Sequence, residues 1–167
     1  MIKKIFITIL LSITLISNSY SAGSSSSGGE GDGPKTKTNY EKAVKLIKSA
    51  NKYEKKGKND KAQSSYEKAL KLLLKSNNKK PNKPDTLNYL GFTSRKLGDF
   101  ENGEKYYLQG LAINPYHIGI NEYLGELYVA TNRHNLAVER LEVLKGCDCK
   151  EYDDLKAIIA GEKVSKY

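Results

Sequence analysis

Cys147 and Cys149 are the only cysteines in this chain of 167 residues, and a single residue separates them. Two thiols at this spacing can bond to each other, hold a soft metal such as Cu(I), bond to another chain, or stay free. His117 is the only further side chain that we consider as a metal ligand beside them. The sequence alone leaves these four possibilities open, and the compartment and the surrounding helices must decide between them.

Further candidates for catalysis are few. The chain has two histidines, and we expect His134 to open a helix of about 12 residues that ends near the cysteines, roughly 18 Å away at 1.5 Å per residue. This distance excludes a Cys-His nucleophile pair with His134. Residues 28–33 have the glycine spacing of a phosphate-binding loop, but Pro34 stands where its lysine belongs and no strand precedes it. The sequence therefore predicts no enzyme, no cofactor and no resident metal.

The first residues have the three-part pattern of an export signal. Lys3 and Lys4 precede an apolar run over residues 5–16, and small residues up to Ser21 suit cleavage before Ala22. The run is shorter than the approximately 20 residues that a membrane-spanning helix needs. We therefore predict a cleaved signal peptide over residues 1–21 and a periplasmic location, with release outside the cell as the alternative.

An exported chain meets an oxidising compartment, where thiols tend to become oxidised. This location favours an internal disulfide between Cys147 and Cys149 over metal binding, an intermolecular bond or free thiols. The bond would close a loop of three residues, for which the chain-entropy model gives a stabilisation of only about 1.6 kcal/mol. We therefore expect the bond to order the local turn and to affect folding little.

Residues 22–38 are rich in glycine and serine, which predicts a flexible linker. Residues 39–167 remain, which is enough for one domain. Thr38 and Glu41 form a T-x-x-E pattern, a capping box that can start the first helix of this domain.

The domain repeats itself with a period of about 34 residues, which indicates stacked helix pairs. The Leu-Gly pair at residues 90–91 recurs at residues 124–125, and Gly103 recurs as Ala137 at the same shift. An earlier copy lies farther upstream than this period predicts, which indicates an insertion over residues 77–83.

This spacing resembles the tetratricopeptide repeat family, with units at about residues 43–76, 84–117 and 118–151. The resemblance implies an all-α fold, a right-handed α-solenoid of three helix pairs. A final helix at about residues 150–160 has apolar residues at helical spacing and is expected to cap the third unit. Asn121 departs from the family pattern, because a large apolar residue is usual at its position.

Glycines and one asparagine mark the expected turns and close contacts of these helices. Gly57, Gly98 and Asn132 lie between the two helices of successive units, where a positive φ is needed. Gly91 and Gly125 lack side chains, which would let the second helix of each unit approach closely.

The resemblance also implies a concave groove lined by the first helix of each unit. Its positions carry polar and aromatic residues, namely Asn51, Asn88, Tyr89, Phe92, Arg95, Glu122, Tyr123 and Glu126. We expect the three aromatic residues to be exposed binding anchors; the alternative is that Tyr89 and Tyr123 pack between units. Some family members grip a terminal carboxylate with lysine, asparagine and arginine, but only Asn51 of that set is present, so this clamp is not expected.

These patterns predict a non-enzymatic adaptor or scaffold that holds a protein or peptide partner of the cell envelope in the groove. One alternative is a redox- or metal-responsive protein that uses the cysteine pair. Another is a binder of anionic surfaces, because residues 35–83 carry 16 lysines against four acidic residues, a net charge of +12. Nucleic acid is not expected as a partner of an exported chain, and the oligomeric state is left open.

Overall fold

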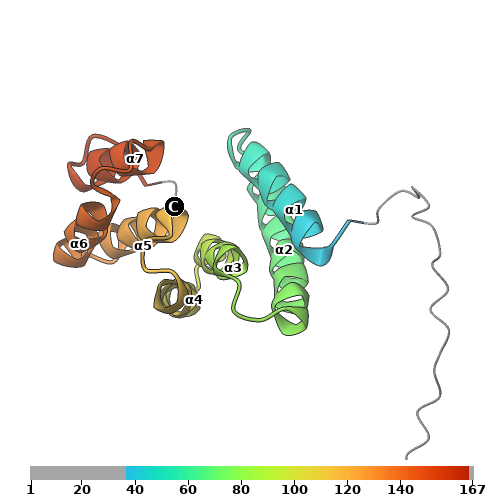
Figure 1. Ribbon diagram of the computed structural model, residues 1–167. Helices are drawn as coiled ribbons and strands as arrows, with labels where there is room; N and C mark the ends of the chain where they lie inside the picture. The colour runs from blue at the N-terminus through green and yellow to red at the C-terminus, as the bar shows by residue number, and fades with distance from the viewer. Residues whose placement is uncertain (1–36, 166–167) are drawn as a thin grey trace, which may run out of the picture. The chain divides into compact units, whose positions relative to one another are not determined.

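The computed structural model describes residues 37–165 of the chain (Figure 1). The predicted signal peptide and nearly all of the predicted linker lie outside the described residues. Between residues 37 and 165 the chain forms seven α-helices and no strand, which confirms the all-α prediction. The helices are α1 (Asn39–Glu54), α2 (Asn59–Lys79), α3 (Pro84–Lys96), α4 (Phe100–Ile113), α5 (Ile118–Ala130), α6 (His134–Leu144) and α7 (Lys150–Ile159). None of these helices is long and apolar enough to cross a bilayer.

The helices form three consecutive pairs followed by a single helix. α1 packs on α2, α3 on α4 and α5 on α6, while α7 packs on both α5 and α6. Figure 1 shows α3 and α5 in the middle of the array, with α4 and α6 on their outer side. α2 has 21 residues, against 14 in α4 and 11 in α6, because part of the 77–83 insertion extends this helix.

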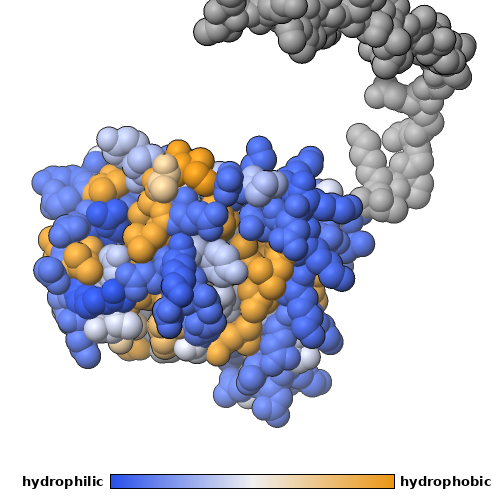
Figure 2. Space-filling view, turned by 90° about the horizontal axis from the view of Figure 1, so that it is seen from below, coloured by the Kyte–Doolittle hydropathy of each residue, from blue (hydrophilic) through white to orange (hydrophobic). Residues whose placement is uncertain are grey.

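The face of the array that Figure 2 shows is mostly hydrophilic. On the face that Figure 2 shows, hydrophilic residues cover most of the end formed by α1 and α2, and hydrophobic residues form narrower stripes beside them. This distribution agrees with the many lysines of the first helix pair.

The turns and the first cap follow local sequence chemistry. Gly57, Gly98 and Asn132 have φ values of 65°, 86° and 58°, as predicted for the turns within the three pairs. At the start of α1 the Thr38 hydroxyl accepts a hydrogen bond from the Glu41 amide, and the Glu41 carboxylate accepts one from the Thr38 amide. Both halves of the predicted capping box are therefore present.

Small residues set how closely the helices approach. A Cβ at Gly91 would lie 2.4 Å from the Tyr107 ring of α4, which confirms a close approach within the second pair. The expectation for Gly125 is wrong, because a Cβ there would lie 2.6 Å from Leu155 of α7, not against the second helix of its own pair. The capping helix inserts Leu155 into this gap, where the side chain is fully buried.

Candidate functional site

The predicted groove residues lie on α1, α3 and α5, and we call this set of side chains the inner face. Three of them are half-buried: Asn51, Tyr89 and Tyr123. The remaining five are buried: Asn88, Phe92, Arg95, Glu122 and Glu126. We call these five buried residues the floor of the inner face. The floor is of mixed polarity, and the two tyrosines and Asn51 beside it remain partly accessible.

The aromatic residues hold the units together. Phe92 is only 7% exposed, with its ring centroid 6.2 Å from that of Tyr66 in α2 and 5.1 Å from that of Tyr123 in α5. The prediction that Phe92 is an exposed anchor is therefore wrong, because a tyrosine of each neighbouring unit packs against its ring. Tyr89 packs edge-on against Tyr40 of α1 at 5.9 Å. Packing between units therefore describes Tyr89 and Tyr123 better than exposure does.

A buried arginine is the centre of the floor. Arg95 is 2% exposed; its Nη1 donates to the backbone oxygen of Tyr123 at 2.6 Å, and its Nη2 lies 3.6 Å from Oε2 of Glu126. The guanidinium also lies 5.9 Å from the ring centroid of Tyr107. Burial lowers the pKa of Arg95 from its ordinary value, while Tyr107 and Glu126 oppose that shift. An arginine side chain nevertheless stays charged in proteins.

Two glutamates share the floor with this arginine. Glu122 and Glu126 are one helical turn apart on α5, so they project from the same side of the helix, and they are 6% and 2% exposed. With Arg95 they give the floor a formal charge of −1. Burying charged groups is costly, and an apolar set of the same volume is often no less stable. Stability alone therefore does not account for this cluster.

The end of the described chain reaches the same floor. Ser165, in the non-helical stretch after α7, donates its hydroxyl to Oε2 of Glu126 at 3.2 Å. Lys163 in this stretch contacts the Asp154 carboxylate at 2.5 Å, which fastens the stretch to α7. Sequence reasoning missed the Ser165 contact because a short polar tail has no periodicity that points to its neighbours.

Asn51, the inner-face residue on α1, is hydrogen-bonded to a residue of α2 in the same helix pair. The Tyr66 hydroxyl donates to Oδ1 of Asn51 at 2.5 Å. Nearby, Nζ of Lys96 lies 2.7 Å from the Glu54 carboxylate and 5.6 Å from the centroid of the Tyr66 ring. Burial, with a smaller contribution from Glu54, raises the pKa of Tyr66, so this phenol remains a neutral donor.

Asn88 connects α3 with α5. It is 8% exposed, and its Oδ1 has no hydrogen-bond partner among the described residues. A Cβ at Gly119 would lie 2.9 Å from the Asn88 amide nitrogen, so the glycine makes room for this side chain. Asn88 therefore supplies an unused hydrogen-bond acceptor to the floor.

The cysteines lie in the connection between α6 and α7. The Cα atoms of Cys147 and Cys149 are 5.2 Å apart, within the range that a disulfide spans, and their sulfur atoms face each other. Gly146 and Asp148 have positive φ values of 89° and 44°, which turn the chain at this point. The geometry suits an internal disulfide, and the bond itself stays a prediction.

His117 was considered above as a metal ligand, but its ring nitrogens contact other groups of the protein. Its Nδ1 accepts a hydrogen bond from the Ile120 amide at 3.2 Å and so caps the start of α5. Its Nε2 lies 3.1 Å from Oδ1 of Asp85. Both ring nitrogens therefore have partners, and residues 37–165 contain no cluster of three or more histidine, cysteine or acidic side chains arranged to hold a metal ion.

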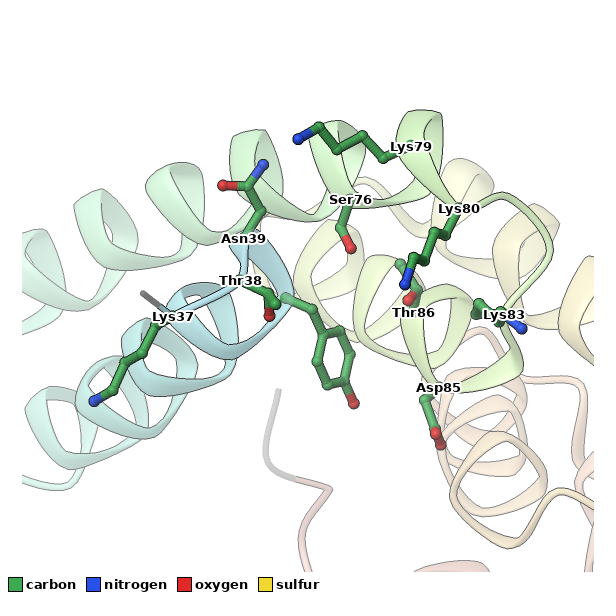
Figure 3. Close-up of a pocket in the computed structure, with 10 residues that line it drawn as sticks. Lys37, Thr38, Asn39, Ser76, Lys79, Lys80, Lys83, Asp85 and Thr86 are labelled. Carbon is green, nitrogen blue, oxygen red and sulfur yellow. The ribbon is translucent and has the colours of Figure 1, made fainter. Parts of the chain in front are cut away.

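A second feature lies away from the inner-face floor. A pocket of about 630 Å³ opens where the start of α1, the end of α2 and the start of α3 meet (Figure 3). Four of the residues that line it are lysines: Lys37, Lys79, Lys80 and Lys83. The charge of this region was evident from the sequence, but the pocket was not, because it depends on how the insertion folds.

Comparison with known proteins agrees with this architecture. The family model for the tetratricopeptide repeat matches residues 46–72 and 85–117, within the first two helix pairs. No curated protein matches the sequence.

Solved structures of similar fold include three domains. The first TPR of Spaghetti (RPAP3), bound to the HSP90 peptide SRMEEVD, has a TM-score of 0.53 and 22% identity, over 77% of this chain and 98% of that chain. The first TPR domain of human RPAP3 has a TM-score of 0.53 and 22% identity, over 75% of this chain and 98% of that chain. The second TPR domain of human RPAP3, in complex with the HSP70 peptide SGPTIEEVD, has a TM-score of 0.51 and 17% identity. The match covers 73% of this chain and 98% of that chain.

These likenesses concern the fold. Together with the family match and the repeat period of the sequence, they account for all three helix pairs. The tetratricopeptide repeat model therefore matches two segments of this chain, and the chain shares the fold of solved tetratricopeptide repeat domains.

Proposed function

We propose that this chain is a non-enzymatic interaction module that binds an extended segment of a partner protein on its inner face. Stacked helix pairs present such a face as a consequence of their geometry. Two of the solved structures with this fold hold peptides, as their HSP90 and HSP70 ligands demonstrate for those proteins. A scaffold with no converging reactive groups among its described residues suits binding better than catalysis.

One observation carries this proposal: the inner face already contacts a non-helical stretch of protein. Ser165 lies in the non-helical stretch that follows α7, and its hydroxyl donates a hydrogen bond to Glu126 on the floor. A partner segment that offers a hydroxyl or a cation could take the same place. The buried charges, which stability does not require, would then serve recognition.

The floor also indicates the chemistry of the segment. The peptides in the solved structures end in the acidic sequence EEVD. In this chain the two glutamates on α5 outnumber Arg95, and Tyr89, Gly119 and Tyr123 hold positions where a carboxylate clamp would carry cations or an asparagine. We therefore propose a segment with a basic or hydroxyl-bearing residue at the α5 side, rather than an acidic terminus.

Site-specific photo-crosslinking tests the face without disturbing the fold. A crosslinking amino acid at Lys48, which is exposed on α1 beside the inner face, should form an adduct with one segment of one envelope protein. The matched control is Leu108, which is 48% exposed on α4 and should give no such adduct. Equal adducts from both positions, or none from Lys48, would contradict the proposal.

We further propose that the chain acts in the periplasm after cleavage before Ala22. The support is the sequence pattern of residues 1–21, with its short apolar run. N-terminal sequencing of the chain from a periplasmic fraction should begin at Ala22. An intact Met1 in the cytoplasmic fraction would exclude this location.

A further inference from the structure

The lysine-lined pocket is produced by a departure from the repeat. The first two units are farther apart than the repeat period, and the extra residues 77–83 continue α2 and then lead into α3. Three of the four lining lysines, Lys79, Lys80 and Lys83, belong to this insertion, while Lys37 precedes α1. The same insertion therefore provides both the shape of the pocket and most of its charge.

The electrostatics of the pocket favour an anion. The lining contains four lysines and one acidic residue, Asp85, whose carboxylate contacts Nε2 of His117 at 3.1 Å. Two helices begin there, and their amino-terminal ends carry partial positive charge, while the end of α2 contributes partial negative charge that its lysines offset. The start of α1 is closed by its capping box, whereas Lys83 provides no side-chain cap for α3. Pro84 has no amide hydrogen, so the amides of Asp85 and Thr86 are the donors at this helix start that lack a side-chain cap.

Neutral donors complete the lining. Thr86 and Ser76 contribute hydroxyls, and Tyr40 contributes a phenol whose pKa is raised to about 12 by burial and by Asp85. Figure 3 shows Lys80 extending from the end of α2 toward Thr86, with Lys37, Lys79 and Lys83 turned outward. A lysine amine on its flexible stem can turn toward a bound anion, at a cost in rotamer freedom.

We propose that this pocket binds a phosphate-bearing ligand, held by the insertion lysines and the start of α3. The volume of about 630 Å³ lies within the usual range for small-molecule sites and exceeds what a bare phosphate would fill. The Tyr40 ring and the lysine stems supply apolar surface for the organic part. An anionic lipid headgroup and a soluble phosphate ester share this chemistry, and the experiment separates them.

The test compares two charge-matched variants of the full chain. The pocket variant carries Lys79→Gln, Lys80→Gln and Lys83→Gln. The control carries the same change at three exposed lysines of the α1–α2 turn, namely Lys55, Lys56 and Lys58. These lie at the far end of a 16-residue helix, about 24 Å from the pocket, beyond the Debye length of about 8 Å at physiological salt. Circular dichroism should confirm that both variants keep their helices.

Each protein is titrated with glycerol 3-phosphate by NMR and sedimented with phosphatidylcholine vesicles that contain phosphatidylglycerol. The pocket variant should lose roughly 100-fold in affinity, since each lysine near an anionic group contributes about fivefold, while the control changes little. Binding of vesicles alone identifies a lipid headgroup, and binding of the ester alone a soluble ligand; both support the pocket. An equal loss in the two variants, or no binding of either probe by the parent chain, would overturn it.

Discussion

Ser165 donates a hydrogen bond to Glu126 at 3.2 Å, although the two residues are 39 positions apart in the chain. The contact brings the non-helical stretch after α7 onto the floor of the inner face. Ser165 therefore lies where we propose that a partner segment binds.

Removal of this stretch should uncover the floor. A chain that ends at Lys163 keeps the contact with Asp154 but loses Ser165, so the synthetic peptide EKVSKY (residues 162–167) should bind to it in trans. The full chain should bind the same peptide more weakly, because its own tail competes. Chemical shifts of the amides near Glu126 measure both affinities. The peptide with alanine at the serine is the control, and equal binding to the two chains would argue against competition.

Arg95 should be essential for stability, because its removal leaves the Glu126 carboxylate buried without this counter-charge. Breaking a buried ion pair costs about 3–5 kcal/mol, so Arg95→Ala should lower the free energy of unfolding by that amount. Replacing Arg95 and Glu126 together by methionine should recover part of this loss. Urea unfolding monitored by circular dichroism provides the values. If Arg95→Ala lowers the free energy of unfolding by less than about 1 kcal/mol, the ion pair behaves as a solvated one and the prediction is wrong.

The features that sequence predicted correctly depend on contacts within a few residues. A turn at Gly57 needs only a positive φ, and the capping box needs only Thr38 and Glu41 three positions apart. The repeat period adds the pairing of helices, because it reports which residues recur on the same helical face. These signals suffice for the helices and their order.

The features that sequence did not predict depend on which residue of a distant unit fills a given space. The repeat pattern assigns Phe92 no partner, yet the rings of Tyr66 and Tyr123 both pack against it. Similarly, Gly125 could not be matched with Leu155, because the capping helix lies outside the repeat. The positions of the inner face were therefore predictable, but the accessibility of each side chain was not.

Gly125 and Leu155 should be energetically coupled. An alanine at 125 places its Cβ 2.6 Å from the Leu155 side chain, which is fully buried and has little room to move. Gly125→Ala should therefore cost about 1–3 kcal/mol of unfolding free energy. In a Leu155→Ala background the clash is absent, so the same change should cost less. A double-mutant cycle measures this difference, and strictly additive effects would disprove the packing argument.

Asp154 should make stability sensitive to acid. Hydrogen bonds from Lys150 and Lys163 lower the pKa of Asp154 below its ordinary 3.8 in the folded chain. The unfolded chain binds the proton first, so this stabilisation is present above pH 3.8 and is lost as the pH falls through the lower, folded-state pKa. The parent should exceed Asp154→Asn in unfolding free energy by up to about 1 kcal/mol at pH 7. Urea unfolding at several pH values should show the difference shrinking in acid; a constant difference would refute it.

Reduction of the cysteine pair should have a small and local effect. The connection between α6 and α7 is already shaped by the positive φ of Gly146 and by the Cys147 amide, which donates to the Leu144 carbonyl at 3.1 Å. A bond to Cys149 closes only three residues, so its loss should lower the unfolding free energy by no more than about 1.6 kcal/mol. Thiol counting without reductant should find none free, and the Cys147→Ser, Cys149→Ser chain should melt close to the reduced parent. Two free thiols in protein from the periplasm, or a collapse of the Tm on reduction, would show that the pair has another role.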